Sequence, residues 1–439
     1  MPVEAQVLKG MRDFLPPRMI LRQHVIDELR HVFELHGFEP LDTPAIEYAE
    51  TLEGKFGDEA DKLIYEFEDR GGRRVGLRYD LTVPLARVVG SHPELVKPFK
   101  RYQISPVWRG EKPAKGRYRE FWQCDVDTVG SSSMLADAEV VTVGYESLRR
   151  IGFSKFRTKI NNRKVLAAIA QYAGVSPEQA GLVYRAIDKL EKIGLEAVKA
   201  ELVAANIEQR AVDRLMEILQ TQGTPETVLS ELASRLATYA SGIEGVHELQ
   251  EIVRYLEDSG VPREFYEIDF TMVRGLDYYT GPIFETTVEE PKIGSICGGG
   301  RYDGLVGMFT HRQVPATGIS LGLERIIDVL ESLREAGAPG VQTVTTVLVT
   351  VFDASTLRES LRLASELRFE GVNTEVFLGK DKLGSQLRYA SRKGIPYAII
   401  IGPDEIAQST VVVKDLAKER QVTVERGDIA AFFHGAHTS

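Results

Sequence analysis

The chain has 439 residues, more than one ordinary domain holds, and this length predicts two or three domains. Hydrophobic residues make up 43% and charged residues 27%, a composition typical of a globular protein and unlike that of a disordered or fibrous one. The formal net charge of −10 argues against nonspecific coating of nucleic acid, although clustered basic residues could still form a local phosphate-binding surface.

Apolar patterning and cysteine content indicate where such a protein functions. No run of about 18 consecutive apolar residues is present, so no membrane-spanning helix is expected. The N-terminal residues lack a basic segment followed by an apolar one, so no secretory signal is expected. The two cysteines, Cys124 and Cys297, are too few and too far apart for a disulfide framework or a cysteine-based zinc site. These features predict a cytoplasmic protein.

The N-terminal segment combines a helical pattern with an extended one. Apolar residues recur at helical spacing over residues 21–36, between a proline start signal and Gly37. Residues 38–44 then form an extended segment whose prolines exclude the centre of a sheet. This layout is common at the edge of a sheet and is also the layout of a self-pairing dimer interface. The pattern alone leaves both possibilities open.

A first hairpin pattern ends at a possible functional residue. Strand-like runs at 64–69 and 73–79 are joined by a glycine turn. The second run ends at Asp80, directly before a helical pattern at 83–89. From this local pattern alone, helix capping is the simplest role for the Asp80 carboxylate.

A second hairpin pattern carries a local excess of positive charge. Strand-like runs at 99–109 and 119–129 flank a polar loop at 110–118. Aromatic residues are interleaved with the basic ones, which favours phosphate binding over a merely solvated face. Between residues 97 and 119, a single acid, Glu111, faces eight basic residues: Lys97, Lys100, Arg101, Arg109, Lys112, Lys115, Arg117 and Arg119.

The middle of the chain is mainly helical. Residues 134–150 predict a helix and residues 156–161 a strand, and residues 163–258 are helical almost throughout. Strand patterns return at 265–272. The long helical segment therefore interrupts a strand-rich region and is predicted to be an inserted unit. It carries no catalytic signature and could be only a spacer.

Residues 274–281, Arg-Gly-Leu-Asp-Tyr-Tyr-Thr-Gly, place an arginine, a carboxylate and two phenols between glycines. Such an arginine is either paired with a neighbouring acid or available to an anionic ligand, and the stretch alone does not decide. Strand patterns follow at 283–289 and 316–321. Three glycines at 298–300 allow close approach of a ligand, but no Gly-Lys-Ser/Thr follows, so this is not a Walker A loop. Arg325 near the start of the next helix is unusual and indicates a bound anion or a nearby carboxylate.

The C-terminal part differs in pattern from the rest. Residues 336–340, Ala-Gly-Ala-Pro-Gly, form the clearest linker, and alternating strands and helices follow from residue 345. This alternation predicts a separate α/β domain of about 95 residues. Residues 380–393 hold five basic side chains against Asp381, which makes a second basic patch.

Taken in order, these motifs resemble the histidyl-tRNA synthetase family, a class II aminoacyl-tRNA synthetase family, over essentially the whole chain. The three class II signatures are the helix and strand ending at Pro44, residues 108–121, and residues 318–325. Residues 274–281 and 299–304 are similar to the histidine-specific signatures of the family. Residues 77–82, Leu-Arg-Tyr-Asp-Leu-Thr, resemble the eukaryote-like branch, whereas many bacterial members have a Pro-Glu-Gly version.

The resemblance implies a fold and a domain organisation. Residues 1–165 and 259–335 are expected to form an α+β catalytic domain with an antiparallel class II sheet flanked by helices. Residues 166–258 would be an inserted helical domain, residues 336–344 a linker, and residues 345–439 a C-terminal α/β anticodon-binding domain. A homodimer is also expected.

The implied activity is ATP-dependent activation of L-histidine to histidyl-adenylate, followed by transfer to the 3′ end of tRNA(His). Arginine suits this chemistry because its planar fork binds phosphate oxygens and keeps its charge. By resemblance, Arg109 and Arg274 are catalytic: both approach the α-phosphate and also contact the bound histidine. Arg325 would bind the ATP tail, and Glu111 would accept a hydrogen bond from the adenine amino group. Mg²⁺ is expected with the β- and γ-phosphates, with its protein ligands unassigned.

Histidine recognition is implied by the same resemblance. Neutral imidazole has one donor and one acceptor nitrogen, and an acid together with a phenol can read both. A site built in this way rejects apolar analogues strongly, because its buried polar groups would be left unpaired. The stretch Asp80, Leu81 and Thr82, together with Gln123, matches positions that hold the α-ammonium group. The matching ring-binding residues are Asp127 and Tyr279, with Tyr278 beside them, and Asp277 is expected to have a structural role.

The expected contacts involve two regions of the tRNA, the acceptor arm and the anticodon. Lys112, Lys115 and Arg117 would meet the acceptor end, the helical insertion would brace its stem, and the C-terminal domain would bind the anticodon. Two non-enzymatic relatives are alternatives: a histidine-sensing regulatory subunit of ATP phosphoribosyltransferase and an uncharged-tRNA sensor. The first typically lacks the anticodon domain and the second normally loses the catalytic arginines, so the features of this chain argue against both.

Overall fold

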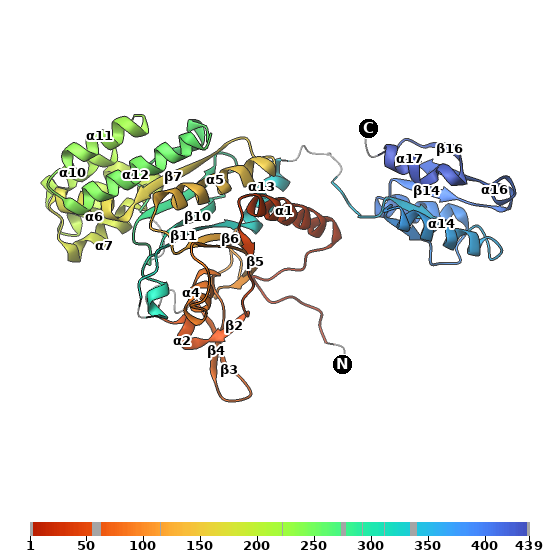
Figure 1. Cartoon of the computed structure of the whole chain (residues 1–439), viewed down its shortest axis with the longest axis horizontal. Coiled ribbons are helices and arrows are strands. Elements are labelled where there is room, and N and C mark those ends of the chain that lie inside the picture. The colour runs from red at the N-terminus through yellow and green to blue at the C-terminus, as the bar shows by residue number, and fades with distance from the viewer. Residues whose placement is uncertain are drawn as a thin grey trace. The chain divides into compact units, whose positions relative to one another are not determined.

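The computed structural model describes residues 3–54, 63–114, 116–221, 223–273, 278–291, 293–310, 312–333 and 340–436. The chain forms two compact units. One contains residues 1–13 and 25–334, and the other contains residues 14–24 and 335–439. Helix α1 (Pro16–Leu35) contributes residues to both units. Figure 1 shows the elements coloured along the chain, from red at the N-terminus to blue at the C-terminus.

The larger unit is built on an eight-stranded sheet within the described residues. Its strands are β1 (Glu39–Pro40), β5 (Phe99–Trp108), β6 (Glu120–Val129), β7 (Phe156–Asn162), β8 (Tyr266–Ile268), β9 (Pro282–Val288), β10 (Ser295–Arg301) and β11 (Ala316–Gly322). Their spatial order is β1-β5-β6-β11-β10-β9-β7-β8. The edge pairs β1–β5 and β7–β8 are parallel and the inner pairs are antiparallel, so the sheet is mixed rather than wholly antiparallel as predicted. The parallel edges arise because each edge strand is joined to its neighbour through a long connection rather than a hairpin.

The register at the centre of this sheet decides which side chains share a face. Arg101 of β5 and Gly318 of β11 both lie opposite Asp127 of β6. Successive side chains of a strand point to opposite faces, so Gln123 and Asp125 share a face with Asp127. One face of β6 therefore carries three polar side chains in a row.

Helix α5 (Met134–Arg150) covers the opposite face of the sheet. Gly144 of this helix faces the side chain of Ile319 on β11, and a Cβ atom at Gly144 would lie 2.9 Å from Cδ1 of Ile319. A side chain at this position would require the end of the Ile319 side chain to move, so α5 packs closely on the sheet here.

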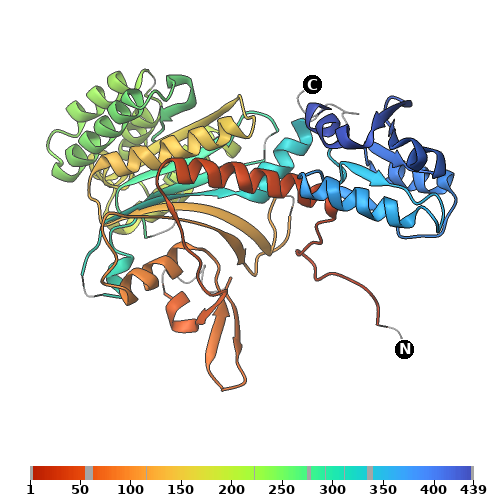
Figure 2. The same cartoon turned by 45° about the vertical axis from the view of Figure 1, so that its right-hand side comes forward.

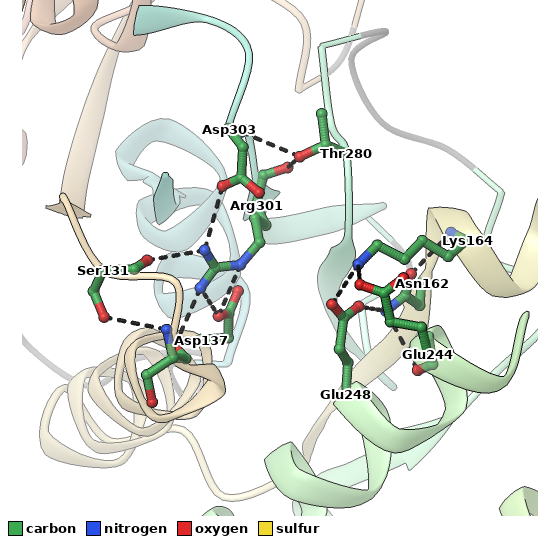
Figure 3. A network of polar contacts seen from close by, with 11 residues as sticks. Ser131, Asp137, Asn162, Lys164, Glu244, Glu248, Thr280, Arg301 and Asp303 are labelled. Atoms are coloured by element: carbon green, nitrogen blue, oxygen red, sulfur yellow. Dashed lines mark hydrogen bonds and ion pairs between the residues drawn. The ribbon is translucent and has the colours of Figure 1, made fainter. Parts of the chain in front are cut away.

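A buried arginine ties the start of α5 to the glycine-rich strand β10. Arg301 forms an ion pair with Asp137 in which both side chains are buried (Figure 3). The same guanidinium donates to the carbonyl oxygens of Ser131 and Ser133 at 2.9 and 3.2 Å. Burial raises the pKa of Asp137 to about 6 even though the charge of Arg301 opposes that shift. Arg301, within the signature at 299–304, thus makes structural contacts.

The segment between β7 and β8 is mainly helical and forms the group of yellow-green helices in Figure 1. Its helices are α6 (Arg163–Ala173), α7 (Pro177–Ile187), α8 (Leu190–Ile193), α9 (Leu195–Ala204), α10 (Gln209–Leu219), α11 (Pro225–Arg235) and α12 (Ala240–Asp258). At the end of β7, Asn162 Nδ2 donates to Glu248 of α12 at 2.7 Å, and Lys164 Nζ donates to Glu244 at 2.8 Å (Figure 3). These contacts anchor α12 to the sheet.

Smaller elements complete the larger unit. A three-stranded sheet has the order β2-β4-β3, and its β3–β4 hairpin extends away from the large sheet in both views (Figures 1 and 2). Helix α4 packs in an apolar cluster that includes Tyr79, Val83, Tyr278 and Tyr302. These elements are β2 (Ile46–Tyr48), α2 (Ala49–Leu52), β3 (Tyr65–Glu68), β4 (Arg74–Leu77), α4 (Thr82–Ser91), η1 (Arg263–Phe265), η2 (Val306–Met308) and α13 (Leu323–Leu333).

The C-terminal unit contains a five-stranded sheet in the order β13-β12-β14-β15-β16 (Figure 2, blue). Its elements are β12 (Val347–Val349), α14 (Leu357–Phe369), β13 (Thr374–Val376), α15 (Leu383–Lys393), β14 (Tyr397–Ile400), α16 (Pro403–Gln408), β15 (Thr410–Asp415), β16 (Arg420–Glu425), η3 (Arg426–Asp428) and α17 (Ile429–Ala436). Side chains alternate along β12: Val347 and Val349 pack with α14 and α17, whereas Leu348 packs with Ala390 of α15. Helices therefore cover both faces. None of the helices in the described ranges of the chain is long and apolar enough to cross a bilayer.

Candidate active site

A cavity of about 370 Å³ opens over the face of the large sheet that carries Asp125 and Asp127. This volume lies in the range of small-molecule sites. The Leu81 side chain lies in the apolar core and Lys112 is exposed to solvent, and neither lines the cavity. The predicted residues that do line it are Asp80, Thr82, Arg109, Glu111, Arg117, Gln123, Asp127, Tyr278, Tyr279 and Arg325.

Asp80 divides its two oxygens between the fold and the cavity. Oδ1 accepts a hydrogen bond from the backbone N–H of Val83 at 3.2 Å, so Asp80 caps α4 as the local pattern predicts. Oδ2 is buried and has no hydrogen-bond partner among the described residues. Burial raises the pKa of Asp80 to about 7, against the opposing effects of the Val83 hydrogen bond and the charges of Arg109 and Arg101. Capping and ligand binding are therefore compatible roles.

The polar row on β6 forms the floor beside Asp80. Gln123 Nε2 donates to Ser320 Oγ of β11 at 2.8 Å. Within the described ranges, Gln123 Oε1 and Asp125 Oδ1 are both buried without a hydrogen-bond partner. Burial raises the pKa of Asp125 to about 7, and the neighbouring charge of Asp127 adds to this effect while Arg101 opposes it.

Asp127 is held from two sides. Arg101 Nη2 lies 2.8 Å from Asp127 Oδ2, and the two side chains are 0% and 4% exposed. The hydroxyl of Tyr302 donates to Asp127 Oδ1, and Arg101 Nη2 also donates to the carbonyl oxygen of Leu81 at 3.1 Å. Burial raises the pKa of Asp127 and the charge of Arg101 opposes the rise. These contacts fix the carboxylate while it faces the cavity.

Three tyrosines form the wall next to Asp127. The ring centroids of Tyr278 and Tyr279 are 4.8 Å apart, and those of Tyr278 and Tyr302 are 5.7 Å apart, both in edge-to-face geometry. Burial raises the pKa of all three hydroxyls above the ordinary value of tyrosine. They therefore stay protonated near neutral pH and act as hydrogen-bond donors.

Two arginines line the cavity without an acidic partner in the described ranges. Arg109 Nε donates to the carbonyl oxygen of Tyr79 at 3.0 Å, and its guanidinium lies 5.0 Å from the ring centroid of Phe121. Arg325 donates to the carbonyl oxygens of Gly116, at 3.2 Å, and Ser295. Burial lowers the pKa of Arg325, and the nearby positive charges of Arg117 and Arg109 act in the same direction. Such a concentration of positive charge is suited to a phosphate ligand.

The loop between β5 and β6 pairs two residues with different predicted roles. Arg117 Nε lies 2.8 Å from Glu111 Oε2, with the Arg117 side chain 61% exposed. Arg119 Nε donates to the Glu111 carbonyl oxygen at 3.1 Å. A ligand amino group that binds the Glu111 carboxylate would therefore compete with Arg117 for it.

The positive excess of this hairpin is smaller than its sequence indicates. Lys100 binds Glu139 at 2.7 Å, Arg101 is paired with Asp127, and Arg119 donates to backbone carbonyl oxygens. These three charges serve the fold rather than a phosphate surface. A charge count along a strand cannot separate such inward-facing residues from outward-facing ones.

Some predicted residues have no described position. Arg274 and Asp277 lie outside the described residues, and so does Lys115 of the polar loop. Conversely, the structure brings three unpredicted residues into the site: Asp125, Arg101 and Tyr302. The two-residue spacing of Gln123, Asp125 and Asp127 is a signal in the sequence that could have identified Asp125. Tyr302 lies within the signature at 299–304, but no pattern indicated the contacts that Arg101 and Tyr302 make with Asp127, because they depend on strand register.

Comparison with protein families gives two matches that together span most of the chain. The family model described as histidyl-tRNA synthetase matches residues 10–326, and one described as anticodon binding domain matches residues 346–435. A curated histidine–tRNA ligase from Aeropyrum pernix is 46% identical, covering 96% of this chain and 95% of the relative. Another from Rhodopirellula baltica is 45% identical, covering 95% of each.

Solved structures agree with these matches. The crystal structure of histidyl-tRNA synthetase from Nostoc sp. has a TM-score of 0.90 and 34% identity, covering 99% of this chain and 100% of that one. The apo enzyme from Staphylococcus aureus, at 24% identity, shares the fold with a TM-score of 0.71, covering 98% and 100% of the chains. The predicted fold class, a class II catalytic domain with a helical insertion and a C-terminal α/β unit, is confirmed apart from the parallel edges of the sheet. The chain belongs to the histidyl-tRNA synthetase family of class II aminoacyl-tRNA synthetases.

Proposed function

We propose that this protein is a histidine–tRNA ligase, which activates L-histidine with ATP and transfers it to the 3′ end of tRNA(His). The observation that carries the proposal is a single cavity lined both by arginines and by buried carboxylates. Arg109 and Arg325 supply positive charge, and Asp80, Asp125 and Asp127 supply the carboxylates. A phosphate tail and an amino acid with an ammonium group require these two environments side by side.

In the first step, the histidine carboxylate attacks the α-phosphorus of ATP. A new phosphorus–oxygen bond forms as the bond to pyrophosphate breaks, giving histidyl-adenylate. The protein contributes mainly positioning and compensation of the negative charge that spreads over the phosphate oxygens. Arg109 and Arg274 would be the catalytic residues that bind the α-phosphate, Arg109 also contacting the histidine carboxylate, while Arg325 would bind the ATP tail. Glu111 would accept from the adenine amino group after Arg117 gives up its contact.

Histidine would lie over β6 with its ring directed at Asp127 and Tyr279. The support for this orientation is that Asp127 is fixed by Arg101 and Tyr302, which leaves it an acceptor, and that the Tyr279 hydroxyl remains a donor. One acceptor and one donor match the two nitrogens of neutral imidazole. Tyr278 would close the pocket beside the ring. Asp80, Leu81, Thr82 and Gln123 would surround the α-ammonium group.

In the second step, a ribose hydroxyl at the 3′ end of tRNA attacks the carbonyl carbon of the adenylate, and AMP leaves. Lys112, Lys115 and Arg117 would meet the acceptor end, and the helical domain at 166–258 would brace the acceptor stem. The domain at 345–439, after the linker at 336–344, would bind the anticodon. Support for the anticodon contact comes from the polar surface of α15, where Arg388 and Arg392 are exposed.

Mg²⁺ is the expected counterion of the β- and γ-phosphates, which it would hold in place and partly neutralise. Mg²⁺ in nucleotide sites is bound mostly by phosphate oxygens and water, with one or two carboxylates. No group of three or more histidine, cysteine or acidic residues in the described ranges is arranged to hold a metal ion alone. We therefore assign the ion to bound ATP and name no protein ligands.

The activity test uses two assays on the same protein. Histidine-dependent exchange of labelled pyrophosphate into ATP measures activation, and charging of tRNA(His) measures transfer. Both are expected. Absence of exchange would refute the enzyme assignment, and exchange without charging would indicate a specialised paralogue.

We further propose that the chain functions in the cytoplasm as a homodimer. The two cysteines are free and buried, which fits a reducing compartment. The self-pairing layout of α1 and the extended segment at 38–44 supports dimer formation, since β1 is an exposed edge strand. Light scattering coupled to size-exclusion chromatography should give about twice the mass of the chain, and a monomer mass at micromolar concentration would contradict the proposal.

A further inference from the structure

Three buried oxygen atoms of side chains that line the cavity have no hydrogen-bond partner among the described residues. They are Asp80 Oδ2, Gln123 Oε1 and Asp125 Oδ1. Their side chains are all more than nine-tenths buried, with exposed fractions of 2%, 9% and 2%. Buried acceptors without a donor are rare in folded proteins because each loses its hydrogen bonds to water. Three of them in one cavity indicate a ligand that brings several donors.

The strand register places Asp125 among these acceptors. Asp125 lies opposite Ser320 of β11, and the Ser320 hydroxyl is hydrogen-bonded to the Asp125 carboxylate. Gln123 Nε2 donates to the same hydroxyl at 2.8 Å. The Ser320 hydroxyl therefore contacts both Gln123 and Asp125. One side-chain oxygen of each of these two residues is left without a partner in the described ranges.

Charge within the cavity points to a cationic ligand. Asp80, Asp125 and Asp127 all line it, and of the cations that act on them Arg101 is paired with Asp127, whereas Arg109 forms no ion pair in the described ranges. Burial raises the pKa of Asp80 and of Asp125 to about 7, so neither carboxylate is well compensated in the free protein. A positive group bound between them would restore their charged forms and relieve the cost of burial.

We propose that Asp125 is a direct ligand of the α-ammonium group of histidine, together with Asp80 and Gln123. The assignment rests on the proposed function and adds a residue to its binding site. An ammonium group has three N–H donors, and the three unpartnered oxygens supply one acceptor for each. Thr82 also lines the cavity, and its hydroxyl can accept a further hydrogen bond while it donates to Tyr278. Asp125 thus gives the ammonium end a second carboxylate, separate from the ring-binding Asp127.

The test is Asp125→Asn, which keeps the shape of the side chain and removes its charge. Binding of L-histidine, histamine and 4-methylimidazole is measured by calorimetry with EDTA present to exclude metal ions. Histidine and histamine carry the ammonium group, whereas 4-methylimidazole has only the ring. Asp125→Asn should weaken the binding of histidine and histamine by about 10- to 100-fold, the usual effect of losing a hydrogen bond to a charged group. Its affinity for 4-methylimidazole should stay within about twofold of that of wild type.

Asp127→Asn is the matched control, because it makes the same change two residues along the same face of β6. It should weaken the binding of all three ligands, since each contains the imidazole ring. Equal losses for histamine and 4-methylimidazole in Asp125→Asn would overturn the assignment, and so would unchanged binding of histidine. Failure of the wild-type protein to bind histidine at all would instead refute the proposed function.

Should Asp125→Asn not fold, Ser320→Ala decides the question. This change removes the hydroxyl that holds both Gln123 and Asp125 and adds no bulk. It should weaken histidine and histamine by about 3- to 10-fold, as expected for a lost neutral hydrogen bond, and spare 4-methylimidazole. A loss shared equally by all three ligands would contradict the proposal.

Discussion

The guanidinium of Arg101 is enclosed by the large sheet and compensates the carboxylate of Asp127 at 2.8 Å. Burying both charges is costly, and their attraction offsets this cost only while both partners are present. The pair therefore fixes the Asp127 carboxylate at the cavity more than it adds net stability. Without Arg101, the Tyr302 hydroxyl alone could not compensate the charge.

Arg101→Met should lower the free energy of unfolding by about 3–5 kcal/mol, because it leaves an uncompensated buried carboxylate. Urea unfolding followed by tryptophan fluorescence measures this, since both tryptophans, Trp108 and Trp122, lie on the β5–β6 hairpin. The control is Arg30→Met, which breaks an exposed pair with Asp27 and should change stability little. Equal effects of the two substitutions would contradict the role assigned to Arg101.

Tyr279→Phe removes the hydroxyl proposed to bind the imidazole and retains the ring that packs on Tyr278. The Michaelis constant for histidine in pyrophosphate exchange should rise about tenfold, because one ring nitrogen loses its partner in a buried site. The constant for ATP should stay the same. Unchanged histidine affinity would remove this phenol from the ring-binding site.

Arg274→Ala should nearly abolish activation while histidine binding is largely kept. Loss of one group that compensates charge in a transition state typically lowers a rate by about 100- to 1,000-fold. Single-turnover formation of histidyl-adenylate measures the rate, and calorimetry measures histidine binding. Activation within a few-fold of wild type would show that the electrostatic role is wrong.

At the scale of elements, β10 and β11 contribute buried glycines to the lining of the cavity. A Cβ atom at Gly318 would lie 2.0 Å from Asp127 Oδ1, and one at Gly299 would lie 2.1 Å from the Gly318 carbonyl oxygen. Neither position has room for a side chain. The glycines of the family signature are therefore required by the contact between strands and by the placement of Asp127.

Gly318→Ala should displace the Asp127 carboxylate, weaken histidine binding by at least tenfold and lower the free energy of unfolding by about 1–3 kcal/mol through overpacking. The matched control is Gly322→Ala on the same strand, where the nearest atom to a Cβ lies 3.7 Å away. Its unfolding free energy should stay close to that of wild type. Similar stability of the two variants would contradict the steric argument.

Elements with strong periodicity could be predicted from the sequence. The β5–β6 hairpin, α5 and the helices between β7 and β8 agree with the predicted ranges to within a few residues. The strand β10 was not predicted, because three consecutive glycines have low strand propensity and resemble a loop. It is a strand because β9 and β11 pair with it on both sides, and such pairing cannot be read from local sequence.

The site was predicted less completely than the fold. Family motifs identified ten of the residues that line the cavity, including Asp80 and Tyr279, but gave no account of what holds them. The partners of Asp127 come from residues 101 and 302, far apart in the sequence, and only the register of the sheet brings them together. Helix capping by Asp80 followed from local pattern, and its second oxygen required the three-dimensional structure.

At the scale of the whole molecule, the raised pKa values of Asp80 and Asp125 link folding to pH. In the unfolded chain these carboxyls ionise near pH 3.8, whereas in the folded protein they ionise near pH 7. Between these values the folded state binds more protons than the unfolded state. The contribution of these groups to stability is therefore present below about pH 4 and is lost as the pH rises toward 7.

The free energy of unfolding of the wild type should accordingly fall, relative to that of Asp80→Asn, as the pH rises from 4.5 to 7. The expected fall is up to about 1.4 kcal/mol per pH unit. Melting temperatures of both proteins at a series of pH values measure the difference. Asp69→Asn serves as the control, because a hydrogen bond from Arg73 lowers the pKa of Asp69 and its contribution to stability should therefore stay constant above pH 4.5. A wild-type stability that rises relative to Asp80→Asn over this interval would contradict the burial of an uncompensated carboxyl.

The glycines of β10 and β11 have a consequence for attempts to load this protein with larger relatives of histidine. A pocket is usually enlarged by replacing a bulky residue with a smaller one. Gly298, Gly299 and Gly318 line the cavity and already carry no side chain, so at these positions nothing remains to be removed. On the side of Asp127, additional volume would have to come from the tyrosine wall, whose members are proposed to recognise the ring. Broader substrate range and loss of discrimination are thus coupled in this architecture.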